Sequence, residues 1–201
     1  MMHIDPTQQQ ERDNYKLMIG SIIPRPIAFI TSQSEEGIVN AAPFSYFNIV
    51  TSNPPMISVS IQRKEGRQKD TARNILQNES FVVHIVSKPF VEEMNKTAAV
   101  LPAHKSELDL TSLTVEDSKI VSVPTIKEAK VAMECVLEHH VTLGKDNNAV
   151  DHIIGKIVNF NIDDELVDNF RIDAQKLDPI SRLAGQNYSE LGNIFALERP
   201  Q

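Results

Sequence analysis

Residues 56–75 read MISVSIQRKEGRQKDTARNI and place a strand, a basic loop and the start of a helix in direct succession. Residues 56–61 alternate apolar and small polar side chains, which is the period of a strand with one buried face. The loop that follows contains Gly66 and several basic residues. Residues 71–77 have a helical pattern, and Asp70 stands where a helix N-cap is expected. The stretch therefore predicts a strand joined to a helix by a basic loop.

This loop concentrates positive charge in an acidic chain. Five of the twelve residues from 63 to 74 are Lys or Arg, whereas the whole chain has a formal net charge of -7. A helix N-terminus offers free backbone N–H groups and a partial positive charge. With Lys69 and the Thr71 hydroxyl beside it, such a place suits a phosphate. Spacing alone leaves two interpretations open, a phosphate site and a solvated basic loop.

Further strands are expected on both sides of this stretch, at residues 27–31, 38–41, 81–86, 130–143 and 153–162. A second helix is expected over residues 89–97, and the polar residues 98–128 read as a long excursion. Many short strands with few helices predict a mainly β fold with some α, of the α+β class. We expect a β-barrel with helices at its edges, formed by a single domain over residues 1–201.

Composition excludes several classes of protein. The sequence pI is near 5.4 and no basic face extends beyond the local cluster, so we expect no nucleic-acid partner. No apolar run is long enough to cross a membrane and no apolar signal segment is present, so a cytoplasmic protein without a membrane partner is expected. The single cysteine, Cys135, fits a reducing compartment. Its apolar strand pattern favours a core thiol over a nucleophile.

Several common functional motifs are absent from the sequence. It contains no GxGxxG, no Walker-type GxxxxGK, no HExxH and no Cys/His set with zinc spacing. His139 and His140 are adjacent and would point to opposite faces of a strand, which makes a poor chelate. A Rossmann dehydrogenase, a P-loop enzyme and a metal site are therefore not expected. No catalytic dyad is evident, and no residue is assigned a catalytic role.

Three other segments carry side chains suited to a ligand. Arg25 lies between two prolines that stiffen its backbone, either to aim the guanidinium or to form a surface turn. Residues 40–48 combine amides, a hydroxyl and aromatic rings, as a pocket for a flat heteroaromatic group would, although a core hairpin would look similar. Residues 179–188 form a second Arg/Gly/Tyr cluster. Together with the basic loop, these segments predict a ligand with a planar ring at one end and a phosphate at the other.

At these residues the chain resembles the flavin reductase-like family, the FMN-binding split-barrel oxidoreductases. That family includes flavoredoxin and the component B reductases of two-component monooxygenases of the nitrilotriacetate type. The resemblance runs from about residue 15 to 195 and rests on five segments in register: PRPIAFITS (24–32), NAAPFSYFN (40–48), NPPMISVSI (53–61), KDTARNI (69–75) and PISRLAGQNY (179–188). It implies a split β-barrel of Greek-key type with peripheral helices.

The resemblance also implies roles for individual residues. Lys69 and Thr71 would hold the FMN phosphate, and Arg25 would contact the phosphate or the ribityl side. The other implied FMN contacts are Thr31 and Ser32 near the ring, Asn40, Ala41, Phe44 and Ser45 along the isoalloxazine and ribityl chain, and Arg182, Gly185 and Tyr188 in a closing segment. Ala184 stands where relatives often have a second glycine, which bears on the geometry of that loop.

The resemblance further implies a homodimer with the flavin near the subunit interface, and NADH or NADPH as reductant. Reduced FMN would either stay bound or pass to a partner monooxygenase. His152 lies in a segment similar to a Gly-Asp-His pattern near the nicotinamide, but Val150 replaces the glycine. His152 is therefore either a nicotinamide contact or a polar strand residue facing the dimer or solvent. Two alternatives remain open: a non-catalytic FMN-binding electron carrier, and a binding protein for another phosphorylated ring such as pyridoxal phosphate.

Overall fold

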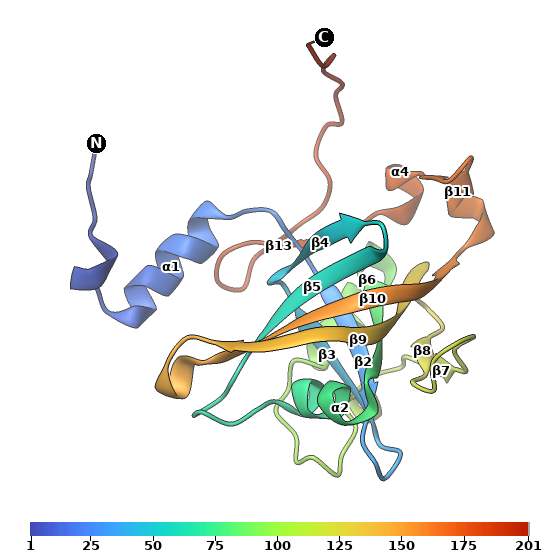
Figure 1. Ribbon diagram of the computed structural model, residues 1–201. Helices are drawn as coiled ribbons and strands as arrows, with labels where there is room; N and C mark the ends of the chain where they lie inside the picture. The colour runs from blue at the N-terminus through green and yellow to red at the C-terminus, as the bar shows by residue number, and fades with distance from the viewer. Residues whose placement is uncertain (201) are drawn as a thin grey trace.

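The computed structural model describes residues 1–200, and a seven-stranded antiparallel sheet forms its centre (Figure 1). The strand order is β3-β2-β6-β9-β10-β5-β4. The bounds are β2 Ala28–Gln33, β3 Val39–Phe44, β4 Phe47–Ser52, β5 Pro55–Gln62, β6 Ser80–Ile85, β9 Val131–Leu143 and β10 Val150–Ile162. The strands cross one another in the view, as they do in a strongly twisted and curled sheet.

Helices and short strands surround this sheet. The α-helices are α1 Glu11–Ser21, α2 Asp70–Asn78, α3 Val91–Lys96 and α4 Ala174–Leu177. The short strands are β1 Arg25–Pro26, β7 Val115–Glu116, β8 Thr125–Ile126, β11 Val167–Asp168, β12 Arg171–Ile172, β13 Ser181–Arg182 and β14 Tyr188–Ser189. The 3-10 helices are η1 Pro6–Gln8, η2 Lys88–Phe90, η3 Glu107–Leu110, η4 Asp146–Asn148 and η5 Asp164–Leu166. None of the helices in residues 1–200 has the length and apolar character needed to cross a membrane.

The predicted mainly β fold with few helices is confirmed. Each predicted strand is present as β2, β3, β5, β6, β9 or β10, and the strands expected at residues 27–31 and 38–41 pair as the β2–β3 hairpin. Neither α1 nor β4 was predicted from the sequence. The expected N-cap is wrong by one residue, because Lys69 occupies the N-cap position of α2 and Asp70 is the first helical residue. The Asp70 carboxylate pairs with Arg73 one turn later, at 2.7 Å, and so does not turn back to cap the helix.

Two apolar clusters pack on opposite faces of the sheet, because successive strand residues alternate in direction. The first cluster contains Ile30, Ile57, Val59, Phe81 and Ile153, together with Ala72 and Ile75 of α2. The second contains Phe29, Val86, Phe90 and Met94, and covers the face next to α3. Cys135 belongs to the first cluster and is fully buried, and burial raises the pKa of its thiol. It is therefore a core thiol, as its strand pattern predicts.

Gly155 of β10 is required by the first cluster. A Cβ atom at this position would lie 2.4 Å from Cζ of the buried Phe81 ring. Replacing Gly155 by alanine should destabilise the protein by about 2–3 kcal/mol, because the ring is enclosed by the core and overpacking of that kind is costly. Urea unfolding measures the change. Gly192→Ala is the matched control, because nothing lies within 4 Å of a Cβ there; equal unfolding midpoints for both variants would contradict this packing.

Candidate functional site

A cavity of about 470 Å³ lies at the N-terminal end of α2. Its walls come from β3, from the basic loop between β5 and α2, and from two segments of the excursion. The lining residues include Asn40, Ala42, Pro43, Phe44, Lys64, Arg67, Gln68, Lys69, Thr71, residues 97–101 and Glu107. Apolar and cationic side chains therefore share one hollow, which suits a ligand with an apolar part and an anionic part.

Three cations line this cavity, namely Lys64, Arg67 and Lys69. Nζ of Lys69 lies over the Phe44 ring, 5.5 Å from its centre, which is a cation–π geometry. Burial lowers the pKa of Lys69, and the nearby Lys64 lowers it further. Both effects disfavour the charged ammonium. The negative charge of a bound phosphate would favour the charged form and so offset both effects.

Three carboxylates also line the cavity, those of Glu65, Asp70 and Glu107. The last two have hydrogen-bond or ion-pair partners within the protein. Asp70 pairs with Arg73, and Oε2 of Glu107 accepts the backbone N–H of Ala41 at 3.2 Å. Burial raises the pKa of Glu107, although hydrogen bonds to its carboxylate oppose this effect. The lysine and arginine side chains therefore remain the groups available to an anion.

The N-terminus of α2 adds hydrogen-bond donors. Lys69 occupies the N-cap position but makes no side-chain capping bond, so the first backbone N–H groups of the helix are left to other acceptors. Nδ2 of Asn40 donates to the Thr71 hydroxyl at 2.8 Å, which leaves the hydroxyl proton of Thr71 free to donate. Lysine, a hydroxyl and helix N–H groups form a donor set that fits a phosphate.

Four of the residues implied by the resemblance line this cavity together: Asn40, Phe44, Lys69 and Thr71. Three others are buried close to it in the β2–β3 pair, where Thr31 is opposite Ala41 and Ser32 is opposite Asn40. Thr31 donates its hydroxyl to the Pro124 carbonyl at 2.7 Å, and Ser32 accepts from Asn40 and Asn74. Within one chain, the side chains of these buried residues support the wall and do not reach into the cavity.

Arg25 and Ser45 line a second cavity, of about 440 Å³, together with apolar residues of α1. The guanidinium of Arg25 is buried and donates to the carbonyl groups of Ile19, Ile22 and Leu183 at 2.8, 2.5 and 2.9 Å. Arg25 therefore clamps the end of α1 to the C-terminal segment. Within one chain it is not brought to Lys69 and Thr71.

The C-terminal cluster lies next to Arg25. Arg182 pairs with Arg25 in the β1–β13 register, and its guanidinium stacks 4.4 Å from the centre of the Tyr188 ring. The Tyr188 hydroxyl donates to Oδ1 of Asn95 at 2.8 Å. Gly185 has a φ of 63°, a conformation that glycine adopts without strain. The implied residues thus form two groups, one around Lys69 and one around Arg25.

His152 lies on β10 next to β5, where its Nδ1 is 2.8 Å from the Ser60 hydroxyl. It is not among the residues that line the cavity at Lys69. The two interpretations of His152 therefore both stand as predictions.

The sequence analysis missed Glu107 and residues 97–101 as cavity residues. Thr97 ends α3, and the others lie in the long excursion. The excursion reaches β3 through the Ser106 hydroxyl, which donates to the Val39 carbonyl at 2.6 Å. No local motif marks such a long-range contact. A signal did exist for Lys64 and Arg67, because both belong to the basic stretch.

The chain is similar to a known domain family and to several solved structures. The sequence profile of the flavin reductase like domain matches residues 19–177. The crystal structure of nitrilotriacetate monooxygenase component B from Bacillus cereus is similar, with 53% identity, 98% of each chain covered and a TM-score of 0.96. The 2-nitrobenzoate 2-nitroreductase NbaA of Pseudomonas fluorescens is similar at 31% identity, with 99% of this chain and 96% of that chain covered and a TM-score of 0.90.

A third similar structure bears on the fold alone. It is a protein with a split barrel domain from Shewanella frigidimarina NCIMB 400, at 22% identity, with both chains fully covered (100% of each) and a TM-score of 0.85. The curled seven-stranded sheet is therefore a split barrel, as the resemblance implied.

Proposed function

We propose that this chain, which belongs to the flavin reductase-like domain family, is an FMN-dependent oxidoreductase. It would take electrons from NADH or NADPH. The observation that carries this proposal is the cavity at the start of α2, where Lys69, the Thr71 hydroxyl and uncapped helix N–H groups converge. This donor set matches the phosphate end of FMN. The similarity to a monooxygenase component B supports delivery of reduced FMN to a partner monooxygenase.

The remaining residues have the following roles in the proposal. Asn40, Ala41 and Phe44, with Thr31 and Ser32 behind them, would place the ring and ribityl chain along β2 and β3. Ser45, which follows β3 and lines the second cavity, would contact the same parts of FMN. Bound FMN would supply the chemistry by accepting a hydride from the nicotinamide. The protein would hold the phosphate and orient the ring, and no general base is needed. His152 would contact the nicotinamide or face the dimer.

We also propose a homodimer with the flavin near the interface. Apolar side chains in α1, directly after it and in β4 are exposed in the single chain, including Met18 (53%), Ile22 (63%) and Ile49 (77%), and α1 projects from one side of the sheet (Figure 1). A partner subunit covering these residues would explain their exposure. In such a dimer, Arg25, Arg182, Gly185 and Tyr188 would approach the flavin from the partner's side. We place the protein in the cytoplasm.

A turnover assay tests the proposal. Oxidation of NADH or NADPH is followed by absorbance with FMN present, and rates that rise and saturate with FMN are expected. A protein that binds FMN without turnover would instead be the electron carrier. A protein whose visible spectrum is that of pyridoxal phosphate would belong to the other alternative. Adding 2-nitrobenzoate as an acceptor tests whether the similarity to a nitroreductase extends to activity.

A further inference from the structure

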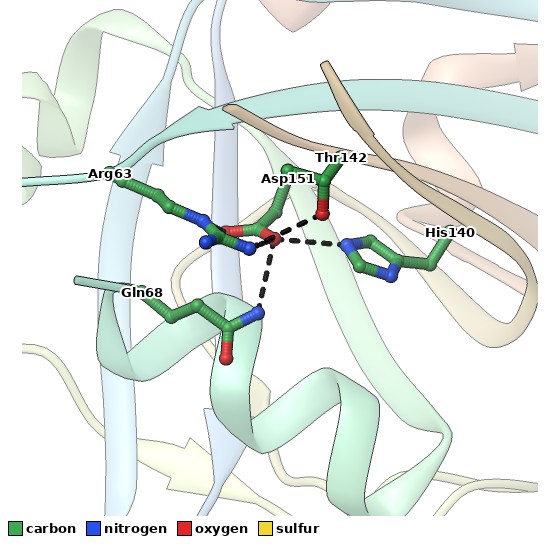
Figure 2. A network of polar contacts seen from close by, with 5 residues as sticks. All are labelled: Arg63, Gln68, His140, Thr142 and Asp151. Carbon is green, nitrogen blue, oxygen red and sulfur yellow. Dashed lines mark hydrogen bonds and ion pairs between the residues drawn. The ribbon is translucent and has the colours of Figure 1, made fainter. Parts of the chain in front are cut away.

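A buried carboxylate joins the basic loop to the barrel. Asp151 of β10 is fully buried, and Figure 2 shows Arg63, Gln68 and His140 directed toward it. Its Oδ1 accepts from Nη2 of Arg63 at 2.8 Å, Nε2 of Gln68 at 3.0 Å and Nε2 of His140 at 2.9 Å. Its Oδ2 accepts from Nε of Arg63 at 3.0 Å. One carboxylate therefore receives four hydrogen bonds, two of them from the planar fork of an arginine.

The charge state of Asp151 follows from these contacts. Burial alone would raise the pKa of this carboxyl group, but the hydrogen bonds from Arg63, Gln68 and His140 outweigh burial and hold the pKa below its usual range. Asp151 is thus an anion in the folded protein. A buried anion with this many partners holds those partners in place, since losing one leaves charge unpaired.

Two of the partners of Asp151, Arg63 and Gln68, stand at the two ends of a tight turn. Lys64 and Arg67 exchange backbone hydrogen bonds of 3.0 and 2.9 Å, and Glu65 and Gly66 between them have φ values of 51° and 76°. Positive φ at both central residues is typical of a two-residue hairpin turn. Two backbone hydrogen bonds therefore close the turn, and Arg63 before it and Gln68 after it connect it to Asp151.

We propose that Asp151 is a positioning residue for the phosphate of the ligand. By holding Arg63 and Gln68, it aims Lys64, Arg67 and Lys69 into the cavity, and Lys69 directly follows Gln68. Asp151 is not among the residues that line the cavity, so it acts through the loop. This inference rests on the proposed function, because it takes the phosphate of FMN as the anion that the loop binds.

The test compares FMN with riboflavin, which lacks the phosphate. Asp151→Asn keeps the shape of the side chain but removes the charge and replaces one acceptor by a donor. We expect its dissociation constant for FMN to rise about tenfold, as the loss of one charge-assisted hydrogen bond implies, while that for riboflavin stays within about twofold. If Asp151 had a purely structural role, the dissociation constants for FMN and riboflavin would change by the same factor. Fluorescence titration of each flavin with purified protein measures both constants.

A matched control is available in the neighbouring strand. Glu134 of β9 is also a buried carboxylate, and it accepts the backbone N–H groups of Lys119, Ile120 and Val121, far along the chain from the basic loop. Glu134→Gln should leave the ratio of FMN to riboflavin affinity unchanged. Arg63→Lys is a milder second variant that keeps the charge but loses the fork, and it should lower the ratio by less than Asp151→Asn.

The possible outcomes separate the two proposals. If Lys69→Ala lowers the affinity ratio but Asp151→Asn and Arg63→Lys leave it unchanged, or weaken both flavins equally, the role of Asp151 is overturned and the phosphate site stands. If the unmodified protein shows no preference for FMN over riboflavin, the phosphate assignment itself fails, and the role of Asp151 fails with it. The inference is supported if Asp151→Asn and Arg63→Lys both lower the ratio of FMN to riboflavin affinity and Glu134→Gln leaves it unchanged.

Discussion

Replacing Lys69 and Thr71 together by alanine is expected to weaken FMN binding roughly a hundredfold while riboflavin binding changes by no more than about threefold. Hydrogen bonds to a charged group contribute about 1.5–3 kcal/mol each. Lys69 points into the cavity over Phe44, and the Thr71 hydroxyl has its proton free to donate. Both groups lie where a phosphate would bind. Riboflavin has no phosphate, so its binding should depend little on either group. Isothermal titration with both flavins measures the effect.

Two features make this comparison informative. The side chain of Thr71 is buried and bonded to Asn40, so the double variant loses some stability as well, and a thermal unfolding curve must show that it is folded. Lys127→Ala is a suitable control, since Lys127 is an exposed lysine that does not line the cavity. Equal weakening of FMN and riboflavin binding in the double variant would show that the phosphate of FMN does not bind at this end of α2.

Stability should fall by about 3 kcal/mol between pH 6.5 and pH 4 because of one buried imidazole. His84 is fully buried, and burial lowers its pKa from 6.5 to about 4, although the hydrogen bond with Phe29 opposes this effect. Its Nδ1 is 2.9 Å from the Phe29 carbonyl, which can only accept, so Nδ1 carries the proton. Its Nε2 then accepts the Ile126 N–H at 2.9 Å. A second proton on Nε2 would oppose that N–H group.

The direction of the pH effect follows from proton uptake. Above pH 6.5 His84 is neutral in both the folded and the unfolded chain, and its contribution to stability is complete. As the pH falls toward 4, only the unfolded chain takes up the proton, so the free energy of unfolding decreases. Urea unfolding at several pH values from 7 to 5 measures the slope before most carboxylates titrate. In His84→Gln the slope over this range should be flatter, although the variant is less stable at pH 7; an unchanged slope would show that His84 is not its source.

The strands could be predicted from the sequence because their signal is local. Alternation in residues 56–61 and the short apolar run in residues 27–31 depend on near neighbours alone, and β5 and β2 appear where these patterns are. α1 was missed because only Ile19 among its residues is buried, so it carries little of the periodicity that identifies a helix. β4 was missed because its first two residues, Phe47 and Asn48, were included in the segment 40–48, which was interpreted as either a pocket wall or a core hairpin.

The candidate site could be predicted only where its residues are close in sequence. Lys69 and Thr71 form one motif, and the structure places them on one cavity. The contact of Arg25 with the Leu183 carbonyl joins residues 158 apart, and nothing around Arg25 indicates that partner. Likewise, the folding of distant segments brings Glu107 to β3 and Asp151 to the basic loop. The division of the implied residues into one group around Lys69 and one around Arg25 is therefore a property of the fold, and no single segment of the sequence indicates it.

The absorbance spectrum of the freshly purified protein, recorded before and after NADH is added without oxygen, tests the central claim most directly. If the protein arrives without flavin, FMN is added first and the unbound fraction is removed. The account predicts flavin absorption bands that bleach when NADH or NADPH is added. A protein that binds no FMN, or one whose bound FMN stays oxidised with both nicotinamides, would contradict it.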